Sequence, residues 1–274
     1  MPLSASEVAR FQRDGYLFPF DVVTRADVAS ARAGIEAWER TLGGPVPKER
    51  RQKPHLFMTF LDAIVHAPEV LDRVESIIGP DILCWESVLF IKEPGTADFI
   101  SWHQDATYWG LEPYEILTAW IALSPATRES GCMRMLPGSH VGDLAPHVDT
   151  FAPNNMLSRG QEIAVAVDES KAVDVVLQPG QMSLHHVKIA HGSAPNRSQD
   201  RRIGLAIRYV PAHVRQAIGD GDTAMLVRGR DRHKHFELEP RPSRDFAPED
   251  MERQRLHRER RMQILMRRTD KTAA

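Results

Sequence analysis

The chain has 274 residues, of which 42% are hydrophobic and 26% are charged, and its 35 basic and 37 acidic side chains leave a formal net charge of −2. This composition is typical of a globular protein and gives no global electrostatic case for a nucleic-acid partner. The only two cysteines, Cys84 and Cys132, exclude a disulfide framework and a CxxC metal motif, and they suit a reducing compartment.

Two features of the sequence speak against a secreted or membrane-spanning protein. The opening residues, MPLSASEVARFQRDGYLF, lack the apolar stretch of a secretory signal peptide. No segment approaches the roughly 18 uninterrupted apolar residues that a membrane-spanning helix needs. We therefore expect a cytoplasmic protein that has neither a membrane nor a nucleic acid as its partner.

The N-terminal part, residues 1–80, has the apolar spacing of helices. Ser4 and Glu7 form a capping-box pattern at the start of the first one. A second helix is predicted over 24–43, where a glycine pair ends it, and a third over 68–80, closed by Gly-Pro.

From residue 81 onward the pattern changes to short β-type runs that are separated by Pro, Gly and polar clusters. Several short strands with such turns favour a barrel or a double-sheet sandwich over a parallel α/β sheet. The predicted fold class is therefore mainly β with flanking helices. The candidate strands are 82–93, 116–124, 132–137, 172–177, 182–189 and 203–210.

The C-terminal part, residues 212–274, is predicted to decorate this core within a single domain that comprises the whole chain. Residues 211–247 look rich in loops. Residues 248–268 have the pattern of a charged helix with a thin apolar stripe, which we expect to dock the helix on the surface. The stripe consists of Met251, Leu256, Met262 and Leu265.

The stretch SWHQDATYWG, residues 101–110, places His103 and Asp105 among aromatic side chains. On a strand these two residues would project from the same face. An imidazole and a carboxylate side by side provide two ligands for a divalent ion such as Fe(II). A distant histidine would complete a facial triad that leaves three coordination positions of the ion open. The alternative is a hydrogen-bonded His–Asp pair in a polar pocket, because HxD alone is a weak signal.

The segment HHVKIAHGSAPNRSQDRRIGLAIRY, residues 185–209, offers the missing histidine and an arginine. An oxygenase with a keto-acid co-substrate needs a cation for the distal carboxylate, and arginine pairs with it bidentately. Two pairs have the same spacing, His191 with Arg202 and His186 with Arg197. We prefer His191 and Arg202, because Arg202 directly precedes a predicted strand whereas Arg197 lies among turn residues. His185 and His186 point to opposite faces of a strand and are interpreted as structural or as supports for the metal ligands.

Four motifs in this order resemble the phytanoyl-CoA dioxygenase family, and with the opening FQRDGYLF the resemblance covers roughly residues 8–211. They are WHQD at 102–105, TAWIAL at 118–123, GCMRMLPGSH at 131–140 and HGSAPNRSQDRR at 191–202. Members of this family are non-haem Fe(II), 2-oxoglutarate-dependent oxygenases. The resemblance implies a double-stranded β-helix (jelly-roll, cupin-like) core over 81–211.

The resemblance also implies roles for individual residues. His103, Asp105 and His191 are the expected catalytic iron ligands, and Arg202 is the expected clamp for the far carboxylate of 2-oxoglutarate. Further side chains are expected to help seat this co-substrate: Ser193, Trp120, Thr118 and Gln104. Gln104 departs from simple strand geometry, because it should face away from the metal. The PGSH segment, 137–140, is expected to form a structural turn.

The implied reaction is hydroxylation of an unactivated C–H bond in a small-molecule substrate, with O₂ as oxidant and release of succinate and CO₂. The alternative is a halogenase or another oxidative tailoring enzyme. Related halogenases have a small residue where this chain keeps Asp105, which disfavours chlorination. A non-enzymatic metal-binding barrel is a more remote one. The basic segment RRQKPH, 50–55, would steer an anionic substrate, unless it is simply a solvated loop.

Overall fold

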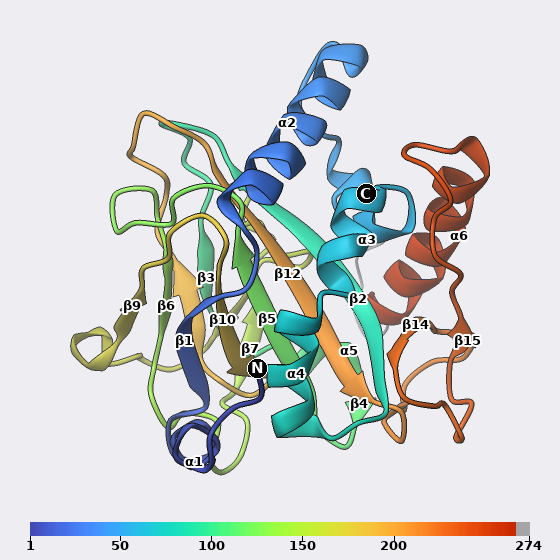
Figure 1. Ribbon diagram of the computed structural model, residues 1–274. Helices are drawn as coiled ribbons and strands as arrows, with labels where there is room; N and C mark the ends of the chain where they lie inside the picture. The colour runs from blue at the N-terminus through green and yellow to red at the C-terminus, as the bar shows by residue number, and fades with distance from the viewer. Residues whose placement is uncertain (267–274) are drawn as a thin grey trace.

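The computed structural model describes residues 1–266 of the chain, and two main β-sheets form its centre (Figure 1). The larger sheet has the strand order β1-β10-β5-β12-β2-β14-β15 and the smaller one the order β3-β11-β6-β9. All neighbouring strands in these sheets are antiparallel except β14 and β15. A mainly β architecture with flanking helices is thus confirmed.

The strands of the larger sheet are β1 (Tyr16–Asp21), β10 (Gln181–His186), β5 (Leu117–Ala122), β12 (Arg202–Pro211), β2 (Ile82–Lys92), β14 (Thr223–Arg228) and β15 (Glu237–Leu238). Those of the smaller sheet are β3 (Ile100–His103), β11 (His191–Ser193), β6 (Met133–Met135) and β9 (Val173–Val175). Two short ribbons pair β4 (Leu111–Glu112) with β13 (Arg215–Gln216) and β7 (His147–Asp149) with β8 (Gln161–Ile163).

The helices are α1 (Ala5–Asp14), α2 (Arg25–Leu42), α3 (Thr59–Val65), α4 (Pro68–Ile78), the single turn α5 (Ala106–Trp109) and α6 (Pro248–Leu265). Short 3₁₀ turns are η1 (Lys48–Arg50), η2 (Pro54–Leu56) and η3 (Glu169–Lys171). In Figure 1, α3 and α4 lie in front of β12 and β2, so they cover one face of the larger sheet. Among residues 1–266, no helix combines the length and the apolar character needed to cross a membrane.

Strand β5 shows why both faces of the larger sheet are buried. Ala119 and Ile121 belong to the apolar core beneath the helices. Trp120 and Ala122 point the other way and pack in a second core with residues of β6 and β9. Because successive side chains on a strand alternate between faces, an uninterrupted apolar run such as this one is expected where both faces are covered. The second core lies between the two sheets.

The local predictions from sequence are largely confirmed. Ser4 caps α1 and forms the reciprocal capping box with Glu7, and the other two predicted helices are α2 and α4. Each of the six candidate strands is present, as β2, β5, β6, β9, β10 and β12. The segment 211–247 differs from the expectation, because it supplies β14, which hydrogen-bonds to β2 and extends the larger sheet.

Helix α6 docks only in part through the predicted apolar stripe, because Met251 and Leu265 pack against the apolar cores whereas Leu256 does not. Leu256 is 43% exposed, whereas Gln254 and Arg261 are almost fully buried. Arg261 forms an ion pair with Glu86 of β2 at 3.2 Å. The helix is therefore also held by polar side chains that find charged partners on the sheet. The last two residues of the predicted helix, 267 and 268, lie outside the described residues.

The basic segment 50–55 is part of the same contact. Lys53 is 1% exposed, and its ammonium group pairs with the buried Glu239 at 2.5 Å. Arg50 donates hydrogen bonds to the carbonyl oxygen of Met251 and to Gln254 on α6. The segment is therefore not a solvated loop: Arg50 bonds to α6, while Lys53 is paired with the buried Glu239. A role in steering an anionic substrate finds no support here.

Candidate active site

The strand pairing of the smaller sheet brings two of the expected ligands together. His103 ends β3 and His191 begins β11, and the two residues are direct partners in the antiparallel register. Their ring centroids are 4.1 Å apart. Both side chains are buried, with exposed fractions of 2% and 7%. The pairing of β3 with β11 thus brings together two histidines that lie 88 positions apart in the sequence.

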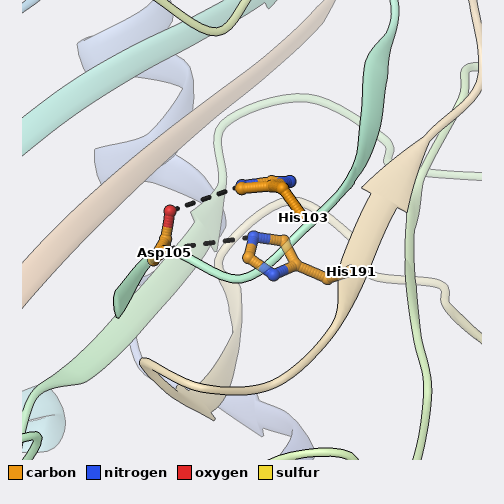
Figure 2. Close-up of side chains that lie close together, drawn as sticks. All are labelled: His103, Asp105 and His191. Carbon is orange, nitrogen blue, oxygen red and sulfur yellow. Dashed lines mark ion pairs between the residues drawn. The ribbon is translucent and has the colours of Figure 1, made fainter. Parts of the chain in front are cut away.

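Asp105 reaches the same point by a different route from the one the sequence suggested. It lies beyond the end of β3, with helical backbone angles (φ −59°, ψ −36°), at the start of the single helical turn α5. The alternation of side chains on a strand therefore does not place it beside His103. The chain turns after His103, and this turn swings the carboxylate back toward both imidazoles, as Figure 2 shows.

The three side chains form a compact ligand set. Asp105 Oδ1 lies 3.3 Å from Nε2 of His103, and Asp105 Oδ2 lies 4.0 Å from Nε2 of His191. One ligand atom from each residue lies within 4.8 Å of the other two. Within residues 1–266 this is the sole cluster of three His, Cys, Asp or Glu side chains with metal-binding proximity.

Backbone hydrogen bonds fix the orientation of both imidazoles. Nδ1 of His103 donates to the carbonyl oxygen of Ser101 at 2.9 Å, and Nδ1 of His191 donates to that of Ile189 at 3.0 Å. Each ring therefore directs Nε2 toward the carboxylate. A metal-ligating histidine characteristically uses its second nitrogen in this way. Two Nε2 atoms converging on a carboxylate need a proton or a cation between them, and this donor set fits Fe(II).

The protonation states agree with such a site. Burial, reinforced by the neighbouring His103, lowers the pKa of His191 to about 4, so its imidazole is neutral at pH 7. Burial alone would raise the pKa of Asp105, but the hydrogen bond with His103 and the proximity of His191 hold it well below its usual range. A neutral imidazole and an ionised carboxylate are the forms that bind a divalent ion.

The ligand set faces a cavity of about 40 Å³ between the two sheets. Arg202, Ser193, Trp120 and Thr118 also line this cavity. Gln104 does not: its side chain donates to the carbonyl oxygen of Lys188 and accepts from the amide of Ala145, so it ties two loops together. The sequence argument that Gln104 faces away from the ligands agrees with this position.

Arg202 lies at one end of the cavity with an unsatisfied guanidinium group. The residue is 2% exposed, and neither Nε nor Nη2 has a hydrogen-bond partner. Its Cζ atom lies 5.4 Å from the ring centroid of Trp120. Burial lowers the pKa of Arg202 to about 10, which leaves it charged at pH 7. Buried polar atoms are nearly always paired, so these nitrogens indicate a place for an anionic ligand.

Lys92, which the sequence analysis did not single out, lies directly opposite Arg202 in the register of β2 and β12. Its ammonium group donates to Oγ of Ser193 at 2.7 Å and to the carbonyl oxygen of Ala194 at 2.6 Å. Burial, together with the charge of Arg202, lowers the pKa of Lys92 to about 6. The hydroxyl of Ser193 is thus held in place by a buried lysine.

The alternative pair from the sequence does not reach the site. Arg197 is exposed on the turn before β12. His186 points away from the cavity and packs against Phe11 and His140. His140, the last residue of the PGSH segment, lies 3.1 Å through Nε2 from the carbonyl oxygen of Gln12, which fits the structural turn expected there.

Two further polar residues line the cavity, although the sequence analysis did not assign them to the site. His185, interpreted as structural, lines the cavity with its ring centroid 5.1 Å from that of His191. Arg208 also lines it. Counting alternate residues along the strand from Arg202 would have found Arg208, because positions 202, 204, 206 and 208 share one face.

Comparison with known proteins places these motifs in a wider context. The family model described as phytanoyl-CoA dioxygenase (PhyH) matches residues 11–204, a range that contains the three clustered side chains and Arg202. The probable alpha-ketoglutarate-dependent hypophosphite dioxygenase of Stutzerimonas stutzeri is 31% identical over 234 residues, which span 83% of this chain and 80% of the relative. Human peroxisomal phytanoyl-CoA dioxygenase is 31% identical over 153 residues, which span 53% of this chain but only 44% of the human protein.

Solved structures agree with the sequence relatives. The apo form of ThoJ, a non-heme monooxygenase, superimposes with a TM-score of 0.83 at 37% identity and covers 94% of this chain and 96% of its own. CytC3 with Fe(II) and alpha-ketoglutarate superimposes with a TM-score of 0.63 at 28% identity and covers 85% of this chain and 92% of its own. The two-sheet core is therefore the cupin-like, double-stranded β-helix of non-haem iron oxygenases.

Proposed function

This chain belongs to the phytanoyl-CoA dioxygenase family and is an Fe(II)- and 2-oxoglutarate-dependent dioxygenase, and we propose that it hydroxylates an unactivated C–H bond of a small molecule. The observation that carries the proposal is the complete ligand set: two imidazoles oriented through Nε2 and one buried carboxylate. Because Asp105 occupies the carboxylate position, all three protein ligands of a hydroxylase are available, which disfavours a halogenase.

The overall reaction is R–H + O₂ + 2-oxoglutarate → R–OH + succinate + CO₂. When bound, Fe(II) supplies the redox chemistry and the open coordination positions for this reaction. His103, Asp105 and His191 would hold the ion on one side only. Arg202 would pair with the far carboxylate of 2-oxoglutarate through the nitrogens that have no partner within the described chain. The buried walls exclude water from the reacting atoms.

The first test is an anaerobic titration of the Fe(II)-loaded protein with 2-oxoglutarate, followed through the weak visible charge-transfer band of the chelate. The band should appear in the wild type and disappear in His191→Ala. Arg202→Ala should shift the titration to much higher 2-oxoglutarate, whereas Arg197→Ala, on the exposed turn, should leave it unchanged. A folded, iron-loaded wild type without the band would contradict the proposal, and a shift only in Arg197→Ala would favour the alternative pair.

The substrate is sought by measuring substrate-dependent succinate release. Hypophosphite and acyl-CoA thioesters are natural first candidates, because relatives are named for hypophosphite and for phytanoyl-CoA. We also propose a reducing, cytoplasmic setting, since Cys84 and Cys132 are both buried free thiols; cell fractionation tests this.

A further inference from the structure

A second group of polar side chains lines the cavity beyond the ligand set, on three neighbouring strands of the larger sheet. Thr118 on β5 is the direct register partner of His185 on β10 and of Arg208 on β12. Directly opposed residues on neighbouring strands project from the same face. All three side chains line the same cavity as the ligand set. They form one row across three strands, which we name the cross-strand row.

Each member of the cross-strand row has a buried polar atom without a partner: Nδ1 of His185, Oγ1 of Thr118 and Nε of Arg208. No hydrogen bond or ion pair joins the Arg208 guanidinium to any other described residue. Unpaired buried polar atoms are rare in native proteins, and each one calls for an explanation such as a ligand. Three of them side by side, aimed into one cavity, indicate a site for a polar ligand.

The guanidinium group of Arg208 packs on an aromatic ring. Its Cζ atom lies 4.5 Å from the ring centroid of Trp109, a distance typical of a cation–π contact. Trp109 in turn packs against Trp85 with the ring centroids 5.3 Å apart. The guanidinium is thereby positioned without a carboxylate.

The acidic residue best placed to neutralise Arg208 is already engaged. Glu86 is the register partner of Arg208 on β2. Its carboxylate oxygens instead accept from the backbone amide of Lys53 and from Nε of Arg261 on α6. Arg208 therefore forms no ion pair within residues 1–266, although its charge acts on the carboxylate of Asp105 and helps to lower the pKa of that group. A charged guanidinium in a confined site binds oxyanions strongly, because its hydrogen bonds are charge-assisted.

We propose that the cross-strand row is the substrate subsite of this enzyme and that it binds an oxyanion group, a carboxylate or a phosphonate, of a small substrate. This inference rests on the proposed function. The subsite is separate from the co-substrate end, because Arg208 follows Arg202 by six positions on β12, which is roughly 20 Å of extended strand. It adjoins the ligand set, since the His185 ring packs on that of His191. Thr118, expected from the resemblance to seat the co-substrate, is assigned to the substrate instead.

The test is isothermal titration calorimetry under anaerobic conditions, with methylphosphonate and propionate as probes. The Fe(II)-loaded protein is first saturated with 2-oxoglutarate, so that Arg202 is occupied. Wild type should bind at least one probe, and the preferred probe identifies the anion class. Arg208→Gln should weaken that binding at least about tenfold, as expected for the loss of a charge-assisted contact, and Thr118→Val should weaken it by a smaller factor. Arg197→Gln, on the exposed turn, is the control.

The 2-oxoglutarate charge-transfer band is measured in every variant and separates the two proposals. Arg208→Gln should keep the band at the wild-type titration midpoint. Loss of the band in Arg208→Gln would assign Arg208 to the co-substrate and overturn the inference. Unchanged probe binding in both Arg208→Gln and Thr118→Val would overturn it too, and so would a wild type that binds neither probe. If wild type lacks the band yet binds a probe in an Arg208-dependent way, the proposed function fails and the anion subsite stands. Thr118→Val keeps the test decisive if Arg208→Gln does not fold.

Discussion

Gly204 lies under the indole of Trp120, and adding a single methyl group there should disturb both folding and co-substrate binding. A Cβ atom at this position would lie 1.9 Å from Cζ2 and 2.4 Å from Cε2 of Trp120. Ordinary contact begins near 3.4 Å, so the indole must retreat by about 1.5 Å, the difference between 3.4 and 1.9 Å. Overpacking of this kind costs about 1–3 kcal/mol, which corresponds to a melting temperature lower by a few degrees.

The displaced indole also carries Arg202 on its face. Gly204→Ala should therefore weaken 2-oxoglutarate binding by about tenfold, the equivalent of roughly 1.4 kcal/mol. Thermal melting and the anaerobic charge-transfer titration measure the two effects. Gly44→Ala is the matched control, because a Cβ atom there would meet nothing within 4 Å. If Gly204→Ala melts and binds 2-oxoglutarate as the wild type does, the packing argument and the role of Trp120 are both refuted.

Three further outcomes follow from the site and its support. Asp105→Ala should abolish hydroxylation and weaken Fe(II) binding, measured by metal titration; full turnover would overturn the ligand assignment. Because the pKa of Lys92 is lowered to about 6 by burial and a neighbouring cation, an incoming carboxylate should raise it again, so 2-oxoglutarate binding should take up a proton at pH 7 and weaken as pH rises from 6 to 8. Calorimetry in buffers of different ionisation enthalpy detects this proton uptake. If the Lys92→Gln variant still takes up a proton on binding 2-oxoglutarate, a group other than Lys92 is responsible. Lys53→Met should destabilise the protein by about 3–5 kcal/mol in urea unfolding, because it removes the ammonium partner of the buried Glu239 carboxylate, which keeps its contacts with Thr223 and His257. Arg260→Gln, in an exposed pair, should cost less than about 1 kcal/mol.

The features that the sequence predicted well are those determined by neighbouring residues. The capping box of Ser4 and Glu7 and the apolar runs of β2, β5 and β12 depend on short-range patterns, and they appear where expected. His103 and Asp105 were also found as a pair, although for a partly incorrect reason. The backbone turns after β3, and strand alternation alone does not predict where a carboxylate beyond that turn will point.

The features that the sequence predicted poorly depend on partners far away in the chain. Nothing in residues 248–268 shows that Arg261 will find Glu86, so docking of α6 was assigned to its apolar residues alone, whereas buried polar side chains share that role. The basic segment was misread for the same reason, since the partner of Lys53 is Glu239. Charged residues look solvent-exposed in a sequence until the buried partner is known, and here the partners are separated by more than 170 positions.

Strand β12 connects the proposed co-substrate and substrate sites through one alternating pattern. Ile203, Leu205 and Ile207 pack beneath the helices, so the residues between them must face the cavity. On that inner face, two arginines flank two small residues, Gly204 and Ala206. Gly204 admits the Trp120 ring, and Arg202 and Arg208, six positions apart, both line the cavity. The same alternation that builds the core thus sets the distance between the two arginines that we propose bind anions, and a rigid central strand holds that distance more precisely than a loop would.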